Sequence, residues 1–390
     1  MKETVVVGLS GGVDSSVAAY VLKEQGYNVI GIYMRNWNDT VGLIQGDCPA
    51  NDDVIFAKLV AKKLDIPFYE VDLSKEYKKR VIDYMFSEYE KGRTPNPDVL
   101  CNREVKFDIF VDVAKKYDAK YVATGHYSRV KKIQNKEGKD VFRLLAGKDN
   151  NKDQSYFLCQ LSQKQLSVAM FPIGHMQKPE LRELARKVEL ATADKKDSQG
   201  ICFVGKVDLP TFLQQQLMPK KGKVIEISKE FYKNYRIKDD IESKAKAYYY
   251  RKSDGIKIGE HNGAHYYTVG QRKGLNIGGK PEPLFIIATD IKNNLIYVGQ
   301  GKKHPGLYRP ALFIEKSEIH WVRPDLRIEE GKETYLVRIR YRQELQKAKI
   351  IFNKKGAYID FDEAQRGITP GQFAAWYIND ELVGSGVIKE

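Results

Sequence analysis

A short string of glycines and small polar residues near the start of the 390-residue sequence has the composition of a phosphate-binding turn. It runs from Gly8 to Ser16, reads Gly-Leu-Ser-Gly-Gly-Val-Asp-Ser-Ser and directly follows the β-branched run Val5–Val7. Apolar residues at helical spacing come next, so the string is predicted to join a strand to a helix, where free amides bind anions and glycine lets phosphate approach. It has neither the lysine of a Walker loop nor the spacing of a dinucleotide fingerprint. We therefore expect a nucleotide-phosphate site of another kind, the alternative being a turn that binds no ligand.

The four cysteines, Cys48, Cys101, Cys159 and Cys202, are the other candidates for chemistry. They are far apart and include no C-x-x-C pair, which argues against a zinc cage and against a dense disulfide framework. In a reducing compartment each is either an inert core thiol or a reactive one. Cys159 follows the apolar pair Phe157-Leu158, so we expect it to serve packing, and we assign the same role to Cys48.

The composition is that of a basic globular protein with more than one domain. Hydrophobic residues make up 42% and charged residues 30%, and Lys+Arg 65 against Asp+Glu 51 gives a formal net charge of +14. This excess favours a polyanionic partner, although a lysine-rich solvated surface is the alternative. The sequence has no run of about 18 apolar residues and no signal peptide, so we expect a cytoplasmic protein with no membrane segment.

The elements that must position these residues alternate, up to about Gly125, between short β-branched runs and helical periodicity. This pattern is typical of a parallel sheet covered by helices on both faces. We expect strands at residues 5–7, 28–33, 68–71 and 121–124. Helices are expected at residues 15–25, 52–64, 75–89, 106–117 and 179–190, with Asp52 as an N-cap. The charged, glycine-containing residues 131–140 predict a solvated hairpin or loop.

Three domains follow from these patterns. Residues 1–210 are expected to form the α/β domain. Residues 211–302 are expected to form a small central lobe with an extended insertion, because residues 220–259 are rich in Lys, Tyr and Asp with little regular period. Alternating segments at 335–341 and 373–377 predict an all-β barrel at residues 303–390.

The string Ser10-Gly11-Gly12-Val13-Asp14-Ser15 resembles the S-G-G-x-D-S signature of the PP-loop ATP pyrophosphatases. That superfamily splits ATP into AMP and pyrophosphate to activate a carbonyl oxygen, and the resemblance implies an adenine-nucleotide alpha-hydrolase-like sheet domain. The superfamily includes amidating synthetases as well as tRNA-modifying enzymes, so the substrate is left open by this motif.

Further strings resemble the tRNA-specific 2-thiouridylases, and together they span nearly the whole chain. They lie at residues 92–102, 124–127, 151–156, 197–203, 270–275, 340–343 and 369–372. The departure from the family is the stretch from about Ser228 to Ile256, which is longer than we expect, so the role of the central lobe stays open.

The resemblance implies a set of site residues. Those expected to bind ATP are Gly8, Leu9, Ser10, Gly11, Gly12, Val13, Asp14, Ser15, Met34 and Gly125. Asp14 is also a candidate to support Mg²⁺. Those expected to meet tRNA are Asn96, Pro97, Asp98, His126, Lys152, Asp153, Gln154, Arg340, Tyr341 and Gln372. Arg and Lys pair with phosphates and Tyr stacks on bases, although basic strand faces are often merely solvated.

In the family pattern Cys202 carries an incoming persulfide and Cys101 is the nucleophile that frees the sulfur, which leaves a disulfide between the two. Only a thiolate or persulfide is nucleophilic enough for this work. We expect both cysteines to lie in flexible loops that bring the two sulfur atoms together, the alternative being two inert buried thiols. Asp98 is expected to polarise the target base or move a proton, unless it is only a helix cap. His126 is expected to meet tRNA, unless it only bonds a neighbouring loop.

The predicted function is therefore ATP-dependent 2-thiolation of the wobble uridine of tRNA, with ATP and Mg²⁺ as cofactors. The expected partners are the tRNAs that accept lysine, glutamate and glutamine, together with a persulfide donor that is either a sulfur relay protein or a cysteine desulfurase. Two alternatives remain at this point: another PP-loop synthetase that amidates its substrate with ammonia, and a noncatalytic RNA-binding protein.

Overall fold

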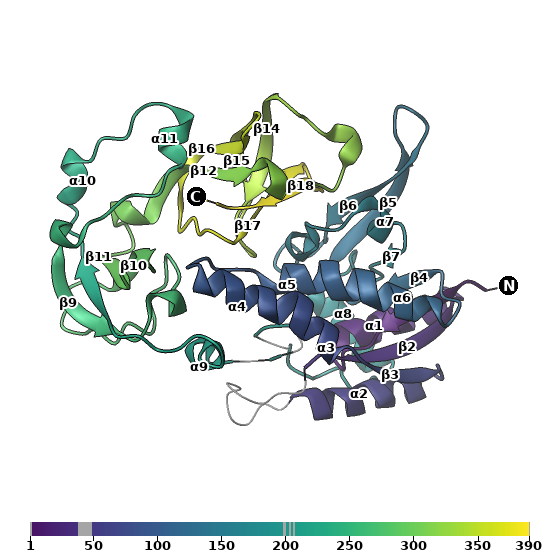
Figure 1. Ribbon diagram of the computed structural model, residues 1–390. Helices are drawn as coiled ribbons and strands as arrows, with labels where there is room; N and C mark the ends of the chain where they lie inside the picture. Colours follow the sequence, from purple (N-terminus) through teal and green to yellow (C-terminus); the bar gives the residue numbers. More distant parts are fainter. Residues whose placement is uncertain (1, 38–48, 198–199, 203, 206, 390) are drawn as a thin grey trace.

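The computed structural model describes residues 2–37, 49–197, 200–202, 204–205 and 207–389. Cys48 and the pair Ser198-Gln199 lie outside the described residues. Figure 1 shows three parts: a parallel sheet with helices at the N-terminal end of the chain, a lobe built on β8 to β11, and a β-domain that ends the chain.

The N-terminal sheet has five strands in the order β3-β2-β1-β4-β7, and every neighbouring pair is parallel. The strands are β1 (Thr4–Gly8), β2 (Asn28–Arg35), β3 (Phe68–Asp72), β4 (Tyr121–Ala123) and β7 (Ala169–Met170). The three valines of β1 are fully buried, as expected for a parallel strand covered on both faces. The predicted α/β class is confirmed, and β7 is the strand that the sequence pattern did not indicate.

Two helical layers cover this sheet. Val5 and Val7 pack in one apolar cluster with α1 (Val13–Glu24), α2 (Pro49–Lys63) and α8 (Lys178–Lys187). Val6, on the opposite face, packs with the segments between residues 73 and 114. β2 and β3 lie on one side of β1, while β4 and β7 lie on the other. Ligands of such sheets bind where the strand order reverses, at the carboxyl ends of β1 and β4.

Two helices that the sequence predicts as regular contain π-helical turns. Residues 74–90 form α3 (Ser74–Tyr77), the π-helix η1 (Lys78–Ile82) and α4 (Asp83–Glu90). The next helical segment begins earlier than predicted and comprises α5 (Pro97–Leu100), the π-helix η2 (Cys101–Ile109) and α6 (Phe110–Lys115). The expectation of a loop at Cys101 is therefore wrong, because Asn96 caps α5 and Pro97 opens it, which starts the helix ahead of the cysteine. Asp52 is likewise in the first turn of α2 and not its cap.

The hairpin of β5 (Ser128–Gln134) and β6 (Asp140–Ala146) belongs to the C-terminal sheet. Residues Leu144 and Leu145 of β6 pair with Leu382 and Glu381 of β18 (Glu381–Val387). The segment expected to be solvated thus joins the N-terminal part of the chain to its last strand. The remaining short helices between this hairpin and the central lobe along the chain are η3 (Ser155–Leu158), α7 (Gln163–Leu166) and α9 (Leu209–Leu213).

The central lobe is a four-stranded sheet in the order β10-β11-β8-β9. Its strands are β8 (Gly222–Glu226), β9 (Ile256–His261), β10 (Leu284–Asp290) and β11 (Leu295–Gln300), and its short helices are α10 (Phe231–Asn234), α11 (Ile241–Ala245), η4 (Lys252–Asp254) and η5 (Ala264–Tyr266). Aromatic residues of the long stretch, including Phe231 and Tyr250, pack with Tyr297 in one apolar cluster. The stretch without regular period therefore has its own core.

The C-terminal β-domain is antiparallel, in the order β12-β16-β15-β14-β17-β18-β6-β5, with β13 paired to β18. Its strands are β12 (Tyr308–Glu315), β13 (Ile319–Trp321), β14 (Gly331–Arg338), β15 (Gln346–Phe352), β16 (Gly356–Arg366), β17 (Phe373–Ile378) and β18, and its short 3₁₀ turns are η6 (Pro305–Leu307), η7 (Lys316–Glu318) and η8 (Pro324–Leu326). Trp376 is fully buried in its core. No helix in the described part of the chain has the length and apolar character needed to span a bilayer.

Candidate active site

Hydrogen bonds of serine hydroxyl groups fix the conformation of the loop between β1 and α1. The Ser10 amide donates to the Ser15 hydroxyl at 3.1 Å, and the Ser15 and Ser16 hydroxyls donate to the Gly12 carbonyl at 3.1 and 2.8 Å. Gly12 is the N-cap of α1, so the amides of the first turn have no carbonyl within the helix to accept them. These bonds shape the loop around a helix N-terminus, which is a site for an anion.

Two glycines of this loop region lie where no larger residue fits. A Cβ atom at Gly125 would lie 2.6 Å from the Ser15 amide nitrogen, and one at Gly11 would lie 2.2 Å from the Asp53 carbonyl oxygen. Met34, at the end of β2, places its methyl group 3.1 Å from the Cβ position of Gly8. Bare backbone with an apolar side chain beside it fits the phosphates and base of a nucleotide at this sheet edge.

Lysines from distant segments supply positive charge to the loop. The Lys178 ammonium donates to both carboxylate oxygens of Asp14, at 2.7 and 2.9 Å, and the Tyr127 hydroxyl donates to Asp14 at 2.9 Å. Lys195 donates to the Gly11 carbonyl at 3.1 Å and pairs with Asp53. Sequence analysis missed both lysines because they lie outside the glycine string and reach it only through the fold.

The predicted role of Asp14 as a support for Mg²⁺ does not fit this arrangement. Both of its oxygens already accept hydrogen bonds from an ammonium group. Within the described ranges, no group of three or more His, Cys, Asp or Glu side chains is placed to hold a metal ion. Asp14 instead anchors Lys178 beside the nucleotide loop.

Lys178 also connects this loop to the segment that carries Cys202. Its ammonium lies 2.8 Å from Asp197, which is paired as well with Lys152 at 2.6 Å and Arg182 at 2.9 Å. Burial works to raise the pKa of Asp197, but the hydrogen bonds and charges of Lys152 and Lys178 outweigh it and lower that pKa to about 2. Asp197 is thus a stable anion five residues before Cys202 in the sequence.

The structure brings the thiols of Cys101 and Cys202 into hydrogen-bonding contact, and both are free cysteines. Cys101 is fully buried, whereas Cys202 is half-buried. The backbone of Cys202 is held on both sides, because its amide donates to the Asp98 carboxylate at 3.0 Å and its carbonyl accepts from the Tyr77 hydroxyl at 2.7 Å. Tyr77 of α3 and Asp98 of α5 therefore hold the backbone of Cys202 in place.

Lys106 sets the charge of this thiol pair. A hydrogen bond from Cys101, followed by the charge of the Lys106 ammonium and its hydrogen bond, lowers the pKa of the Cys202 thiol to about 7. Burial and the neighbouring Cys202 raise the pKa of Cys101 well above its ordinary value. Near neutral pH about half of the Cys202 thiol is accordingly ionised, while Cys101 stays protonated.

The π-helix η2 explains how Lys106 reaches the sulfur atoms. Lys106 follows Cys101 by five residues, and in an α-helix such residues point in directions about 140° apart, since each residue turns the helix by about 100°. The wider π turn, with its i→i+5 bonds, brings them onto one face. Only the π-helical geometry could have drawn attention to this lysine, which sequence analysis missed.

Comparison with known proteins gives three matches to family models and many curated relatives. The tRNA methyl transferase HUP domain matches residues 3–206, the tRNA methyl transferase PRC-barrel domain residues 237–300, and the Aminomethyltransferase beta-barrel domain residues 313–388. The tRNA-specific 2-thiouridylases MnmA of Flavobacterium johnsoniae and Christiangramia forsetii are each 57% identical over 393 residues, with 99% of both chains covered. That of Streptococcus thermophilus is 45% identical, covering 100% of this chain and 96% of its own. The chain belongs to the tRNA-specific 2-thiouridylase family. The resemblance seen in the sequence is confirmed.

In this 2-thiouridylase family member, the residues expected to meet the target base are organised by the C-terminal domain. Asn96 accepts a hydrogen bond from the Val99 amide at 3.3 Å, and Pro97 and Asp98 occupy the first turn of α5. The Gln372 side chain donates to the carbonyls of Thr94, at 2.9 Å, and Pro95, at 3.1 Å. Gln372 therefore holds the segment that leads to Asp98.

His126 lies inside the protein. It is 7% exposed, its Nδ1 atom lies 2.7 Å from the Thr124 hydroxyl, and its ring meets that of Phe171 edge-on. Burial first, and then the charge of Lys106, lower the pKa of His126 well below its ordinary value. The ring is neutral at pH 7 and offers no charge to a phosphate.

The run Lys152 to Gln154 is also engaged with the protein. Lys152 pairs with Asp197, and the Gln154 side chain accepts from the Tyr127 amide at 2.9 Å. Asp153 is 5% exposed, accepts from the amides of Gly147 and Ser155, and pairs with Arg338 at 3.0 Å. The structure thus places Asp153 where it orients its neighbours, while Lys152 and Gln154 remain partly accessible.

Arg340 and Tyr341 follow β14 at the surface. Arg340 is exposed, and the Tyr341 ring packs against that of Phe157 with 4.4 Å between centroids. The Phe157 carbonyl accepts from the side chain of Asn102, the residue after Cys101. Tyr341 is therefore connected to the neighbour of Cys101 through Phe157, whose ring contacts Tyr341 and whose carbonyl accepts from Asn102.

Cys159 has the packing role that its sequence indicated. It is fully buried in the large apolar cluster, and burial raises its pKa to about 12.

Proposed function

We propose that this chain replaces the carbon-2 oxygen of the wobble uridine of tRNA with sulfur, using ATP to activate that oxygen. The observation that carries the proposal is the contact between the Cys101 and Cys202 thiols, in a chain whose named relatives are 2-thiouridylases. Two of the family models are named for tRNA methyl transfer, but the relatives that match the full chain at 45 to 57% identity are named 2-thiouridylases. The pair of thiols favours sulfur transfer.

Activation is required because a uridine carbonyl would have to expel oxide or hydroxide. In the proposed first step the carbon-2 oxygen attacks the α-phosphorus of ATP, an oxygen–phosphorus bond forms, and pyrophosphate leaves. The amides of the first turn of α1 would hold the phosphates, and Lys178 and Lys195 would offset their negative charge. Mg²⁺ would accompany the triphosphate, and no residue is assigned to it because Asp14 is held by Lys178.

Sulfur enters through Cys202. Its thiolate attacks the outer sulfur of a donor persulfide, which makes a Cys202 persulfide and releases the donor thiol. The terminal sulfur then attacks carbon 2 and AMP leaves. The Cys101 thiolate attacks the inner sulfur, which forms a Cys101–Cys202 disulfide and leaves the second sulfur on uridine as the thiocarbonyl. A thiol reductant restores both cysteines.

The charges of the resting site agree with this order. Cys202 is the thiol with the lowered pKa, so it is the one ready to accept sulfur. Cys101 is held protonated while the Cys202 sulfur is anionic. Burial is the first cause of the raised pKa of Cys101 and the Cys202 sulfur adds to it. Once that sulfur is bonded to a second sulfur, its charge no longer contributes, and the Lys106 ammonium is left to stabilise the Cys101 thiolate. Asp98 would polarise the base, since its carboxylate lies beside the backbone of Cys202.

The partners belong to the proposal too. The RNA would be the tRNAs for lysine, glutamate and glutamine, and the sulfur donor a relay protein or a cysteine desulfurase. Arg340, Tyr341, Lys152 and Gln154 would contact the anticodon loop, and the reaction would take place in the cytoplasm, where tRNA is available.

The decisive experiment combines the protein with ATP, Mg²⁺, a persulfide donor and unmodified tRNA, followed by digestion and mass spectrometry of the nucleosides. We expect sulfur in place of oxygen at the wobble uridine, and release of pyrophosphate that depends on tRNA. Cys101→Ser and Cys202→Ser should each abolish thiolation with tRNA binding nearly intact. An amidating synthetase would consume ammonia and release AMP without tRNA, and a noncatalytic RNA-binding protein would release no pyrophosphate.

A further inference from the structure

The central lobe contains a cationic pocket that has no part in the thiol site. It has a volume of about 650 Å³ and is lined by residues 220–223, 249–252 and 293–295 together with Glu260, Asp290 and Tyr297. Five of the lining side chains are cationic, whereas only Glu260 and Asp290 are acidic. The cations are Lys220, Lys221, Lys223, Arg251 and Lys252. Residues 249–252 all come from the stretch that is longer than expected for the family.

The positive charge of this pocket is only partly offset by Glu260, whose pKa is lowered first by Lys257 and then also by Lys221 and Lys223. Among the residues that the structure describes, none of the five cationic side chains takes part in an ion pair. Lys252 lies within hydrogen-bonding distance of Lys223, and this contact, with the charges of Lys252 and Lys257, lowers the pKa of Lys223. Two ammonium groups in contact repel each other, so an anion between them would relieve the repulsion.

The pocket also has an aromatic side chain on its rim and a rigid floor. Tyr249 is 69% exposed. Behind it, Tyr250 and Tyr297 are buried with ring centroids 5.3 Å apart, and the Tyr250 hydroxyl is hydrogen-bonded to that of Tyr232 at 2.5 Å. An exposed ring beside clustered cations is the combination that binds RNA, since the ring stacks on a base while the cations meet phosphates.

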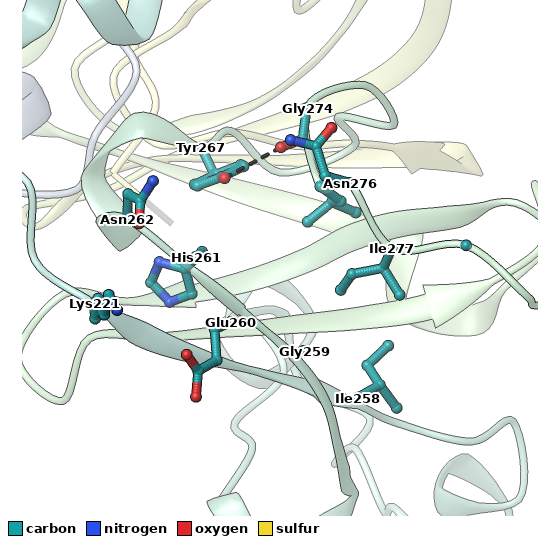
Figure 2. Close-up of a pocket in the computed structure, with 12 residues that line it drawn as sticks. Lys221, Ile258, Gly259, Glu260, His261, Asn262, Tyr267, Gly274, Asn276 and Ile277 are labelled. Atoms are coloured by element: carbon teal, nitrogen blue, oxygen red, sulfur yellow. Dashed lines mark hydrogen bonds between the residues drawn. The ribbon is translucent and has the colours of Figure 1, made fainter.

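A second pocket continues this surface. Figure 2 shows it between β9 and the loop that carries Gly274 and Asn276, with the Tyr267 hydroxyl donating to the Gly274 carbonyl at 3.2 Å. It has a volume of about 430 Å³ and shares Lys221 and Glu260 with the cationic pocket. The two adjoining pockets together are therefore larger than a single phosphate group needs.

The lobe is docked where an RNA at the thiol site could reach it. Gly92, in the turn after α4, packs against the side chain of Ile291, and a Cβ atom there would lie 2.3 Å from it. Ile291 follows Asp290 of the cationic pocket, while Gly92 leads directly to the segment that ends at Asp98. Figure 1 shows α4 reaching from the parallel sheet to this lobe.

We propose that the pocket formed by Lys220–Lys223 and Tyr249–Lys252 is a second RNA-binding site, which holds the phosphate backbone of the tRNA outside its anticodon stem-loop. The proposal rests on the proposed function for the identity of the RNA. The two sites act on one molecule, so the pocket raises the affinity for whole tRNA without touching the reacting uridine.

The test compares two RNA probes, a full-length unmodified tRNA and its isolated anticodon stem-loop, by equilibrium binding over a range of salt concentrations. The variant is Lys223→Gln/Lys252→Gln, and the matched control is Lys62→Gln/Lys136→Gln, which removes two exposed lysines elsewhere. We expect the variant to bind full-length tRNA about tenfold more weakly, with a salt slope smaller by about 1.4 to 1.8, as two lost phosphate contacts require. Binding of the stem-loop should not change.

Tyr249→Ala should weaken binding of full-length tRNA, and Tyr249→Phe should retain it, because a phenyl ring also stacks. Equal weakening of both RNA probes, or of neither, would overturn the proposal. The proposal would also be overturned if the Lys223→Gln/Lys252→Gln variant bound tRNA normally and lost thiolation only when a protein supplied the sulfur. The pocket would then bind an acidic protein and not RNA. If wild-type protein binds tRNA with these properties yet never thiolates it, the proposed function fails and the RNA site stands.

Discussion

The carboxylate of Asp98 accepts a hydrogen bond from the backbone amide of Cys202 at 3.0 Å. One residue of the helical layer thereby anchors the segment that contains Cys202, and in the proposed function the same residue polarises the base. The two tasks are separable, since the first needs an oxygen acceptor and the second needs the charge.

Asp98→Ala should therefore release the Cys202 segment, because the amide loses its acceptor at a cost of about 1 to 2 kcal/mol. Hydrogen exchange at the amides of Ile201, Cys202 and Gly205 should become about tenfold faster. Asp98→Asn, which keeps an oxygen acceptor, should leave exchange near the wild-type rate and still lose thiolation. Full activity of the Asn variant would show that the charge of Asp98 has no part in the chemistry.

Lys106→Gln should raise the pKa of Cys202 from about 7 towards that of an ordinary thiol, because the neighbouring positive charge and hydrogen bond are removed. A rise of one unit leaves about a tenth of the thiol as thiolate at pH 7, compared with about half before. The rate of alkylation of Cys202 by iodoacetamide, measured against pH, should shift its midpoint upward by that amount. Lys106→Arg should shift it less, and Lys116→Gln, at an exposed lysine, should not shift it.

Gly125→Ala should weaken ATP binding, because the new Cβ atom would lie 2.6 Å from the Ser15 nitrogen and must displace the start of α1. We expect an ATP affinity lower by more than about tenfold and a stability loss of about 1 to 3 kcal/mol. Calorimetric titration with a nonhydrolysable ATP analogue measures the first and thermal unfolding the second. Gly278→Ala, where a Cβ atom meets nothing within 4 Å, is the control and should change neither.

Gln372→Ala should destabilise the protein by about 1 to 2 kcal/mol, since two hydrogen bonds to Thr94 and Pro95 are lost. Because the affected segment carries Asp98, kcat for thiolation should fall more than KM for tRNA rises. A rise in KM alone, with unchanged thermal stability, would mean that Gln372 meets tRNA directly and does not hold this segment.

Arg340→Ala, unlike Gln372→Ala, should affect tRNA binding and leave the stability of the protein almost unchanged. The side chain is exposed, so stability should hardly change, while tRNA binding should weaken and its salt slope should fall by about 1. An unchanged slope would remove Arg340 from the RNA interface.

The sequence by itself determined the local features of this protein. The valine run of β1, the glycine string before α1 and the Asn96-Pro97 start of α5 depend on steric and hydrogen-bonding preferences of neighbouring residues, which are present in the chain before it folds. The family resemblance added the identity of the cysteines and the nucleotide loop. The strand of β1 and the turn that leads into α1 were predicted correctly in kind, whereas the start of α5, the helix ends and the π-helical turns were not.

Only the tertiary structure decided which distant groups meet. Lys178 reaches Asp14, Gln372 reaches Thr94, and the β6 strand joins β18 because strand order and helix packing bring remote segments together. The same holds for the charge of Cys202, which depends on a π turn and on burial beside Lys106. Electrostatic effects of this kind are set by distances through the folded chain, and spacing along the sequence carries no record of them.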